Sequence, residues 1–247
     1  MTLLRKLTWL ELKLFLREPL TVLFALALPL TILFVMGGVF GNDVNQEEFL
    51  YRGVGAMDYY VPAYIALVCA AVGLISLPTH IAKNREQGVL KRYHASGISS
   101  RAVAGSQVAV TFVIAAVSGV VMIAAAMPVY DVSNPDSLAK VVGGFVLVAL
   151  MFAAIGILLG AVMPSSRAGQ ALGVMLWFVF MMLGGVSAPP EVMTGALDTL
   201  GKLTPMHHGV LVMHDAWLSL DPGPAWWVVA AVTVVCGVAA VRFFRWE

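Results

Sequence analysis

The sequence predicts an all-α membrane protein with six transmembrane helices, and three observations support this fold class. Apolar residues make up 60% of the 247 positions and charged residues only 12%, whereas soluble domains are about 45–50% apolar and about 25% charged. The charged residues are clustered rather than dispersed. Six long uncharged segments lie between the clusters, and each has the roughly 20 residues that a helix needs to cross about 30 Å of hydrocarbon.

The transmembrane helices are expected at residues 19–40, 60–80, 102–127, 140–163, 168–186 and 225–244. Lipid offers no hydrogen-bond partner to the backbone, so these segments should be helical. The alternative, a β-barrel, would show strands of about ten residues with alternating apolar and polar positions, but the segments here are continuously apolar. The first segment is too long for the apolar part of a cleaved signal peptide, so we expect it to remain as a span.

The segment before the first span, residues 2–17, has the pattern of an amphipathic helix. Its leucines recur at helical spacing, at Leu3, Leu7, Leu10 and Leu14. We therefore expect an interfacial helix that lies on the membrane surface. The alternative is a basic segment that only directs membrane insertion.

The distribution of Lys and Arg predicts the orientation. With six spans and a cytoplasmic N-terminus, 12 of the 15 Lys and Arg residues fall in cytoplasmic segments, and the exceptions are Arg52, Lys140 and Lys202. Cytoplasmic loops carry this excess of positive charge. The sequence thus predicts a multi-pass protein of the cytoplasmic membrane with both termini inside. The net charge of only +1 gives no indication of a nucleic-acid partner.

Residues 188–220 form an exterior segment that is moderately apolar but broken by prolines and glycines. Two short helices are expected here, at about 190–200 and 205–218, because Thr204 followed by Pro205 is typical of a helix start. Neither helix is long enough to cross the membrane. We expect a re-entrant hairpin, which requires surrounding protein or a cavity.

The interiors of the predicted spans contain small residues and lack charged ones. The spacings Gly156-x-x-x-Gly160 and Gly169-x-x-x-Gly173 favour close packing of helices.

Ion-coupled carriers usually need ionisable groups inside the membrane, and the uncharged segments offer none. This argues against a secondary carrier and favours an external source of energy.

The cytoplasmic loop at residues 82–100 is expected to contain a short helix between two spans. Asn84 could cap its start, with Gln87 three residues later, and Gly97 is suited to end it. The residues expected on one face are Leu90, Tyr93 and His94. Such a helix could bind a soluble partner, although a merely basic loop that directs topology is the alternative.

The loop sequence from Arg85 to Ile98, Arg-Glu-Gln-Gly-Val-Leu-Lys-Arg-Tyr-His-Ala-Ser-Gly-Ile, resembles the cytoplasmic loop of type-two ABC exporter permeases. That family typically begins this loop with Arg-Glu-x-Gly-Thr-Leu. Val89 here replaces the common Thr, and Gly97 replaces a common Pro. The Arg17-Glu18-Pro19 start of the first span, the six spans and the Pro-broken hairpin are also similar. The likeness is strongest to drug-resistance exporters of the daunorubicin type.

This resemblance implies that transport and ATP hydrolysis are carried out by different subunits. Two permease chains, expected as a homodimer, would pair above two copies of an ABC ATPase, which would bind ATP and Mg²⁺. The loop helix would contact the ATPase through Glu86, Gly88, Leu90, Tyr93 and His94. The chain has no G-x-x-x-x-G-K-[ST] phosphate-binding sequence, so we expect no ATP hydrolysis by this chain and no cofactor in it.

The expected function is export of an amphipathic drug, natural product or lipid across the cytoplasmic membrane. The candidates for the substrate path are Tyr64, Phe178 and Met182, because aromatic and Met side chains adapt to varied apolar ligands. The alternative is that these side chains only pack against helices or lipid.

The histidines of the hairpin are expected to be polar helix caps rather than metal ligands. They are His207, His208 and His214, beside Asp215. The alternative function is a secondary carrier or a structural subunit of a membrane complex.

Overall fold

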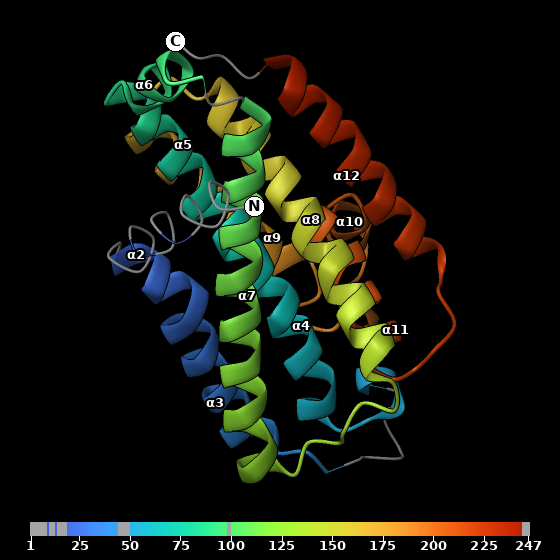
Figure 1. The fold of residues 1–247 in the computed structure, drawn as a ribbon. Coiled ribbons are helices and arrows are strands. Elements are labelled where there is room, and N and C mark those ends of the chain that lie inside the picture. The colour runs from blue at the N-terminus through green and yellow to red at the C-terminus, as the bar shows by residue number, and fades with distance from the viewer. Residues whose placement is uncertain (1–8, 10–12, 14–18, 44–49, 98–99, 244–247) are drawn as a thin grey trace.

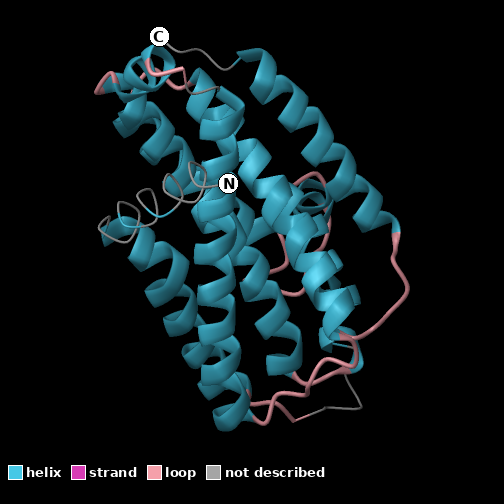
Figure 2. Cartoon of the chain, viewed as in Figure 1, coloured by secondary structure: helices cyan, strands magenta, loops and turns pink. Residues whose placement is uncertain are grey.

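The computed structural model describes residues 9, 13, 19–43, 50–97 and 100–243. Every regular element within these residues is a helix (Figures 1 and 2). Six helices are long and apolar enough to cross a membrane. The predicted all-α membrane fold and the predicted number of spans are therefore confirmed.

The helices follow one another in the order that the sequence predicts. The first span consists of α2 (Pro19–Val22), the π-helix η1 (Leu23–Ala27) and α3 (Leu28–Phe40). The second consists of α4 (Ala56–Ala71), the π-helix η3 (Val72–Ser76) and α5 (Leu77–Glu86), after the short helix η2 (Leu50–Gly53). The remaining helices are α6 (Val89–Ala95), α7 (Ser100–Tyr130), α8 (Leu138–Val162), α9 (Ser166–Leu183), η4 (Pro190–Val192), α10 (Ala196–Lys202), α11 (Pro205–Trp217) and α12 (Pro224–Phe243).

The bundle has two chemically different ends. One end, here called the basic end, carries α6 together with the end of α5, the start of α9 and the end of α12 (Figure 1). Its charged residues are mostly cations: Lys83, Arg85, Lys91, Arg92, Arg167 and Arg242. The opposite end, here called the acidic end, carries Asp43, Asp58, Asp131, Asp136, Asp215 and Asp221.

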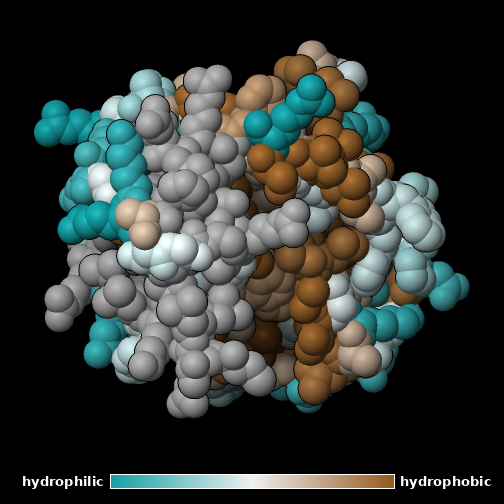
Figure 3. Space-filling view, turned by 45° about the horizontal axis from the view of Figure 1, so that its top comes forward, coloured by the Kyte–Doolittle hydropathy of each residue, from teal (hydrophilic) through white to brown (hydrophobic). Residues whose placement is uncertain are grey.

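The surface between the two ends is apolar. Hydrophobic residues, brown in Figure 3, form a band that runs from top to bottom of the view, to the right of its centre. On α12, the large exposed side chains are Trp227, Val234, Val235, Val238, Val241 and Phe243. Such a surface fits contact with lipid or with another apolar helix rather than with water.

The second span lies at the centre of the bundle, and its apolar stretch is entirely buried. Glycines allow the neighbouring helices to approach its backbone. A Cβ atom at Gly156 of α8 would lie 2.0 Å from the carbonyl oxygen of Gly73, and one at Gly173 of α9 would lie 2.0 Å from that of Leu74. The predicted role of these small-residue spacings in close helix packing is confirmed.

The second span, Ala56–Glu86, is longer than the expected 60–80, and contacts with Asn42 account for its earlier start. The side-chain oxygen of Asn42 accepts the backbone N–H groups of Met57 (2.9 Å) and Asp58 (3.1 Å). These are among the N–H groups that a helix start leaves without an internal partner. Pro62 consequently lies inside α4 rather than at its start.

In the segment at residues 188–220, α11 lies where the second short helix is expected, whereas the helix expected at about 190–200 is divided into η4 and the later α10. Thr204 caps α11, since its hydroxyl accepts the N–H of His207 (3.3 Å), and Pro205 occupies the first turn. Near the start of α11, Gly209 faces Val148, Met151 and Phe152 in the middle of α8. The position of these helices in a membrane leaflet stays a prediction.

The predicted interfacial helix at residues 2–17 lies outside the described residues, apart from Trp9 and Lys13. The ammonium of Lys13 is 5.2 Å from the centre of the Trp9 ring, a distance suited to a cation–π interaction.

Candidate functional site

The loop at the basic end contains one short helix, α6. The backbone φ is +67° at Gly88 and +74° at Gly97, a conformation that glycine adopts without steric cost. Glycines therefore set both ends of α6, and the prediction that Gly97 stops the helix is confirmed. The prediction that Asn84 caps this helix is wrong. Asn84 lies inside α5 and is only 7% exposed, because α5 continues to Glu86 and the chain turns at Gly88 instead.

The structure places the five predicted ATPase-contact residues on two neighbouring elements and their connection. They are Glu86 at the end of α5, Gly88 in the turn, and Leu90, Tyr93 and His94 on α6. The side chains of the last three lie outside the described part of the chain. Lys91 and Arg92 on the same helix are exposed. The contact with an ATPase stays a prediction.

Arg85, next to this loop, binds the end of another span. Its guanidinium donates hydrogen bonds to the carbonyl oxygens of Gly160 (3.4 Å), Ala161 (3.1 Å) and Met163. These carbonyls belong to the last turn of α8 and its cap, where acceptors lack partners inside the helix. A cation at the C-terminal end of a helix also interacts favourably with the helix dipole. Arg85 therefore caps α8.

Glu86, the adjacent residue, binds the beginning of α9. Its two carboxylate oxygens accept the backbone N–H of Ser166 (2.9 Å) and the hydroxyl of Ser166 (2.8 Å). Ser165 caps the same helix, because its hydroxyl accepts the N–H of Ala168 (3.2 Å). Arg85 and Glu86 thus hold the two sides of the turn between α8 and α9, and we call this pair the Arg85–Glu86 clamp.

The clamp is not among the sequence predictions, in which Glu86 contacts only a partner protein. The sequence does contain one indication of the clamp. A cation such as Arg is stabilised at the C-terminus of a helix, and an anion such as Glu at the N-terminus of a helix. The turn around Pro164 offers both within a few residues. The sequence does not show that the end of α5 lies beside this turn.

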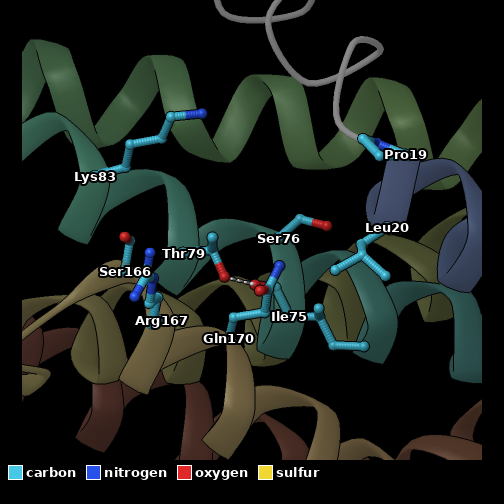
Figure 4. Close-up of a pocket in the computed structure, with 9 residues that line it drawn as sticks. All are labelled: Pro19, Leu20, Ile75, Ser76, Thr79, Lys83, Ser166, Arg167 and Gln170. Atoms are coloured by element: carbon cyan, nitrogen blue, oxygen red, sulfur yellow. Dashed lines mark hydrogen bonds between the residues drawn. The ribbon is translucent and has the colours of Figure 1, made fainter.

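A cavity of about 310 Å³ is lined in part by Ser166, the residue that Glu86 binds (Figure 4). Its lining comes from α2, from η3 and α5, and from α9, and consists of Pro19, Leu20, Ile75, Ser76, Thr79, Lys83, Ser166, Arg167 and Gln170. We call it the basic-end cavity. Figure 4 shows Lys83 and Arg167 toward one side and Leu20 and Ile75 toward the other, with Thr79 and Gln170 between them. The cavity is therefore itself amphipathic.

The predicted substrate-path residues do not lie together. Tyr64 is fully buried and stacks on Tyr60, with ring centres 5.6 Å apart. Phe178 and Met182 are 44% and 48% exposed on the outer face of α9. Phe178 contacts Phe24 of η1, with ring centres 6.2 Å apart. The two α9 residues are thus accessible from the side of the bundle, whereas Tyr64 is not. Their role in transport stays a prediction.

The three histidines of α11 make separate contacts. The Nε2 of buried His214 lies 2.9 Å from the carbonyl oxygen of Tyr59, and burial lowers the pKa of His214 to about 3. The His207 ring centre lies 5.3 Å from that of His208. Burial also lowers the pKa of His207. Asp215 pairs with Arg52 at 3.1 Å. Across the described residues, no group of three or more His, Cys, Asp or Glu is arranged to hold a metal ion.

A second polar contact that the sequence did not predict ties three segments together at the acidic end. Asp58, expected in an exterior loop, is buried in the first turn of α4. Its carboxylate accepts the N–H (2.7 Å) and the hydroxyl (3.2 Å) of Ser133, and the side-chain amide of Asn42 (3.4 Å). These bonds link the end of the first span, the start of the second and the connection between the third and fourth.

Comparisons with known proteins agree with this architecture. The family model described as ABC-2 type transporter matches residues 2–216. Two relatives named "Probable multidrug ABC transporter permease YbhR", from Escherichia coli strains K12 and O157:H7, are each 26% identical over 197 residues. These alignments cover 76% of this chain and 52% of each relative, so the chain spans about half the length of these relatives. Together with the six apolar spans, the family match shows that the chain belongs to the ABC-2 type transporter family as a multi-pass membrane permease.

Proposed function

We propose that the chain is the permease subunit of an ABC exporter that moves an amphipathic drug, natural product or lipid across the cytoplasmic membrane. Separate ATPase subunits would supply the energy. Two copies of the chain would form a homodimer, with two ATPases bound at the basic end in the cytoplasm. Each ATPase would hold ATP and Mg²⁺.

The observation that supports this proposal is the link between α6 and the spans. Only two residues, Gln87 and Gly88, separate the Arg85–Glu86 clamp from the start of α6. Arg85 contacts the end of α8 and Glu86 the start of α9. A protein that pushes on α6 would therefore act on the second, fourth and fifth spans together. An ATPase that closes on ATP could use this connection to change the shape of the permease.

The proposal is tested by coexpressing the chain with its candidate ATPase and measuring cargo-stimulated ATP hydrolysis in liposomes. Leu90→Asp combined with Tyr93→Ala should abolish the stimulation or the ATPase binding while the chain still inserts. Arg242→Gln, at the basic end of α12, is the control and should keep both. ATP hydrolysis by the purified permease alone would contradict the proposal. So would labelling of residues 86–96 from outside the cell.

The alternative, a secondary carrier or a structural membrane subunit, predicts a different outcome in the same liposomes. A secondary carrier would move cargo without an ATPase, and the movement would stop when ion gradients are dissipated. A structural subunit would move no cargo under either condition.

A further inference from the structure

A second cavity, of about 190 Å³, lies between α7 and α8 in the half of the bundle nearer the acidic end. Figure 1 shows these two helices diverging toward that end, with α4 visible between them. The lining comes from α4, α7, α8 and α11 and consists of aliphatic residues, one Phe, one Met and one Gly. We call this cavity the α7–α8 groove. A group that needs hydrogen bonds would find no side-chain partner in its lining.

The α7–α8 groove has a buried floor and an exposed rim. Ile65 of α4 and Met213 of α11 are buried, whereas Val120 of α7 and Leu138 of α8 are 65% and 71% exposed. Both α7 and α8 are long and apolar enough to span the membrane, so the rim faces hydrocarbon rather than water. An unfilled apolar space leaves its lining without partner atoms on one side. The floor is therefore fully packed only when an apolar group occupies the groove.

The dimensions of the groove fit a single hydrocarbon chain. The lining extends from Ala116 to Ile123 on α7 and from Leu138 to Phe145 on α8, a length of about 10 Å at 1.5 Å per residue. A volume of about 190 Å³ over this length gives a mean cross-section of about 20 Å². A helix with its side chains is about 10–12 Å across. A whole helix is thus too wide to enter, and only a thin chain or single side chains could fill the groove.

The groove also has the direction of an acyl chain in a bilayer. It follows two spans, and its length of about 10 Å is two-thirds of the roughly 15 Å of hydrocarbon in one leaflet. At the end nearer the middle of the membrane, the Phe145 ring packs edge-on against that of Phe112, with ring centres 6.0 Å apart. At the other end, Leu138 begins α8 beside the acidic end of the bundle. A lipid tail would therefore enter from the headgroup side and end at the two rings.

We propose that the α7–α8 groove binds one acyl chain of a bilayer phospholipid, which completes the packing between α7, α8 and the buried floor. In the predicted orientation the acidic end faces outward, so the lipid belongs to the outer leaflet. The bound chain contacts Ile65 of the central second span and Met213 of α11, and so holds α7 against both. This lipid stays with the protein, and its binding does not depend on which cargo is transported.

The test is photolabelling of the full chain in lipid nanodiscs that contain a phosphatidylethanolamine with a diazirine in the middle of one acyl chain. Mass spectrometry then locates the labelled residues. We expect residues 116–123 and 138–145 to be labelled several-fold more strongly than Val234 and Val235 of α12. These two residues are 63% and 67% exposed, much like Val120, and so report the ordinary contact with lipid in exchange.

Gly119→Leu should fill the groove from within. A Cβ atom at Gly119 would lie 3.8 Å from Ile65, an ordinary contact, so the Leu side chain can take the place of the acyl chain. Labelling of both groove segments should then fall to the level of α12. Gly143→Leu is the matched control, because it adds the same side chain to α8 outside the groove, where a Cβ atom meets nothing within 4 Å. Ala116→Leu is a second filling variant and should give the same loss of labelling.

Three results would overturn the inference. One is equal labelling of the groove and of α12 in the unaltered chain. Another is labelling of the groove that neither Gly119→Leu nor Ala116→Leu reduces. The third is an oxidative cross-link between two copies carrying Val120→Cys that the unaltered chain, with Cys69 and Cys236, does not form, since a second copy would then cover the groove. ATPase binding and ATP-driven transport, on which the proposed function depends, are measured separately from all three.

Discussion

Glu86 accepts two hydrogen bonds from Ser166, one from its backbone N–H at 2.9 Å and one from its hydroxyl at 2.8 Å. The two residues are 80 positions apart in the chain. The bonds attach the end of the second span to the beginning of the fifth. Several expected outcomes depend on this and on neighbouring contacts.

Replacing Glu86 with Ala should loosen the start of α9. The variant removes both bonds to Ser166 and the negative charge at a helix N-terminus, which stabilises such an end. Hydrogen–deuterium exchange should become several-fold faster at the amides of residues 166–169, and less cargo should move for each ATP hydrolysed. Asp136→Ala, which removes an exposed carboxylate at the acidic end, is the control. Unchanged exchange at α9 in the Glu86 variant would contradict the clamp.

Replacing Gly88 or Gly97 with Ala should strain the ends of α6. The φ angles there, +67° and +74°, cost a residue with a Cβ atom about 1–2 kcal/mol. We expect weaker ATPase binding, measured by copurification, with normal membrane insertion. Gly105→Ala provides a matched control, because Gly105 lies within α7 and a Cβ atom there meets nothing within 4 Å.

Replacing Gly156 or Gly173 with Ala should separate the second span from its neighbours. The added Cβ would lie 2.0 Å from a carbonyl oxygen in both cases, so the helices must move apart. Overpacking of this kind costs about 1–3 kcal/mol, which a lower midpoint of thermal unfolding in detergent would reveal. Gly143→Ala adds the same atom on α8 where nothing lies within 4 Å and should leave the midpoint unchanged.

His214 should make the folded state sensitive to acid. Its pKa falls from the ordinary 6.5 to about 3 in the folded chain, so between these values the unfolded chain binds a proton that the folded chain does not. Stability is therefore highest above pH 6.5 and declines as the pH falls toward 3, by about 1.4 kcal/mol per pH unit. At pH 5 the loss from this residue is about 2 kcal/mol.

His214→Phe should flatten that decline, as measured by unfolding at pH 5 and pH 8. The decline should not disappear, because the pKa of His207 is lowered too. An equally steep decline in the variant would show that His214 is not the group responsible.

The six spans and several helix ends could be predicted because they depend on short stretches of sequence. Solubility in lipid is a property of one segment, and a cap such as Thr204 or a stop such as Gly97 acts on its own helix. The Arg85–Glu86 clamp and the tie between Asn42, Asp58 and Ser133 could not be predicted. Each joins helix ends that the chain brings together only after folding, and Asp58 and Ser133 are 75 residues apart.

The substrate path illustrates the same limit. Tyr64, Phe178 and Met182 have similar chemistry in the sequence, but only the position of each span around the second one decides which side chains reach the surface. Tyr64 belongs to the central span and is enclosed, whereas α9 lies at the periphery with Phe178 and Met182 exposed. The amphipathic cavity likewise requires three spans to meet, so no single segment of the sequence indicates it.

The contact between Gly73 and Gly156 has a consequence for how the permease can change shape. If either helix rotated or slid, a residue with a side chain would enter this contact, where even a Cβ atom at Gly156 would lie 2.0 Å from the carbonyl oxygen of Gly73. The second span and the two helices whose glycines pack on it, α8 and α9, should therefore move as one rigid block during a transport cycle. Any hinge would have to lie elsewhere, where longer side chains separate the helices.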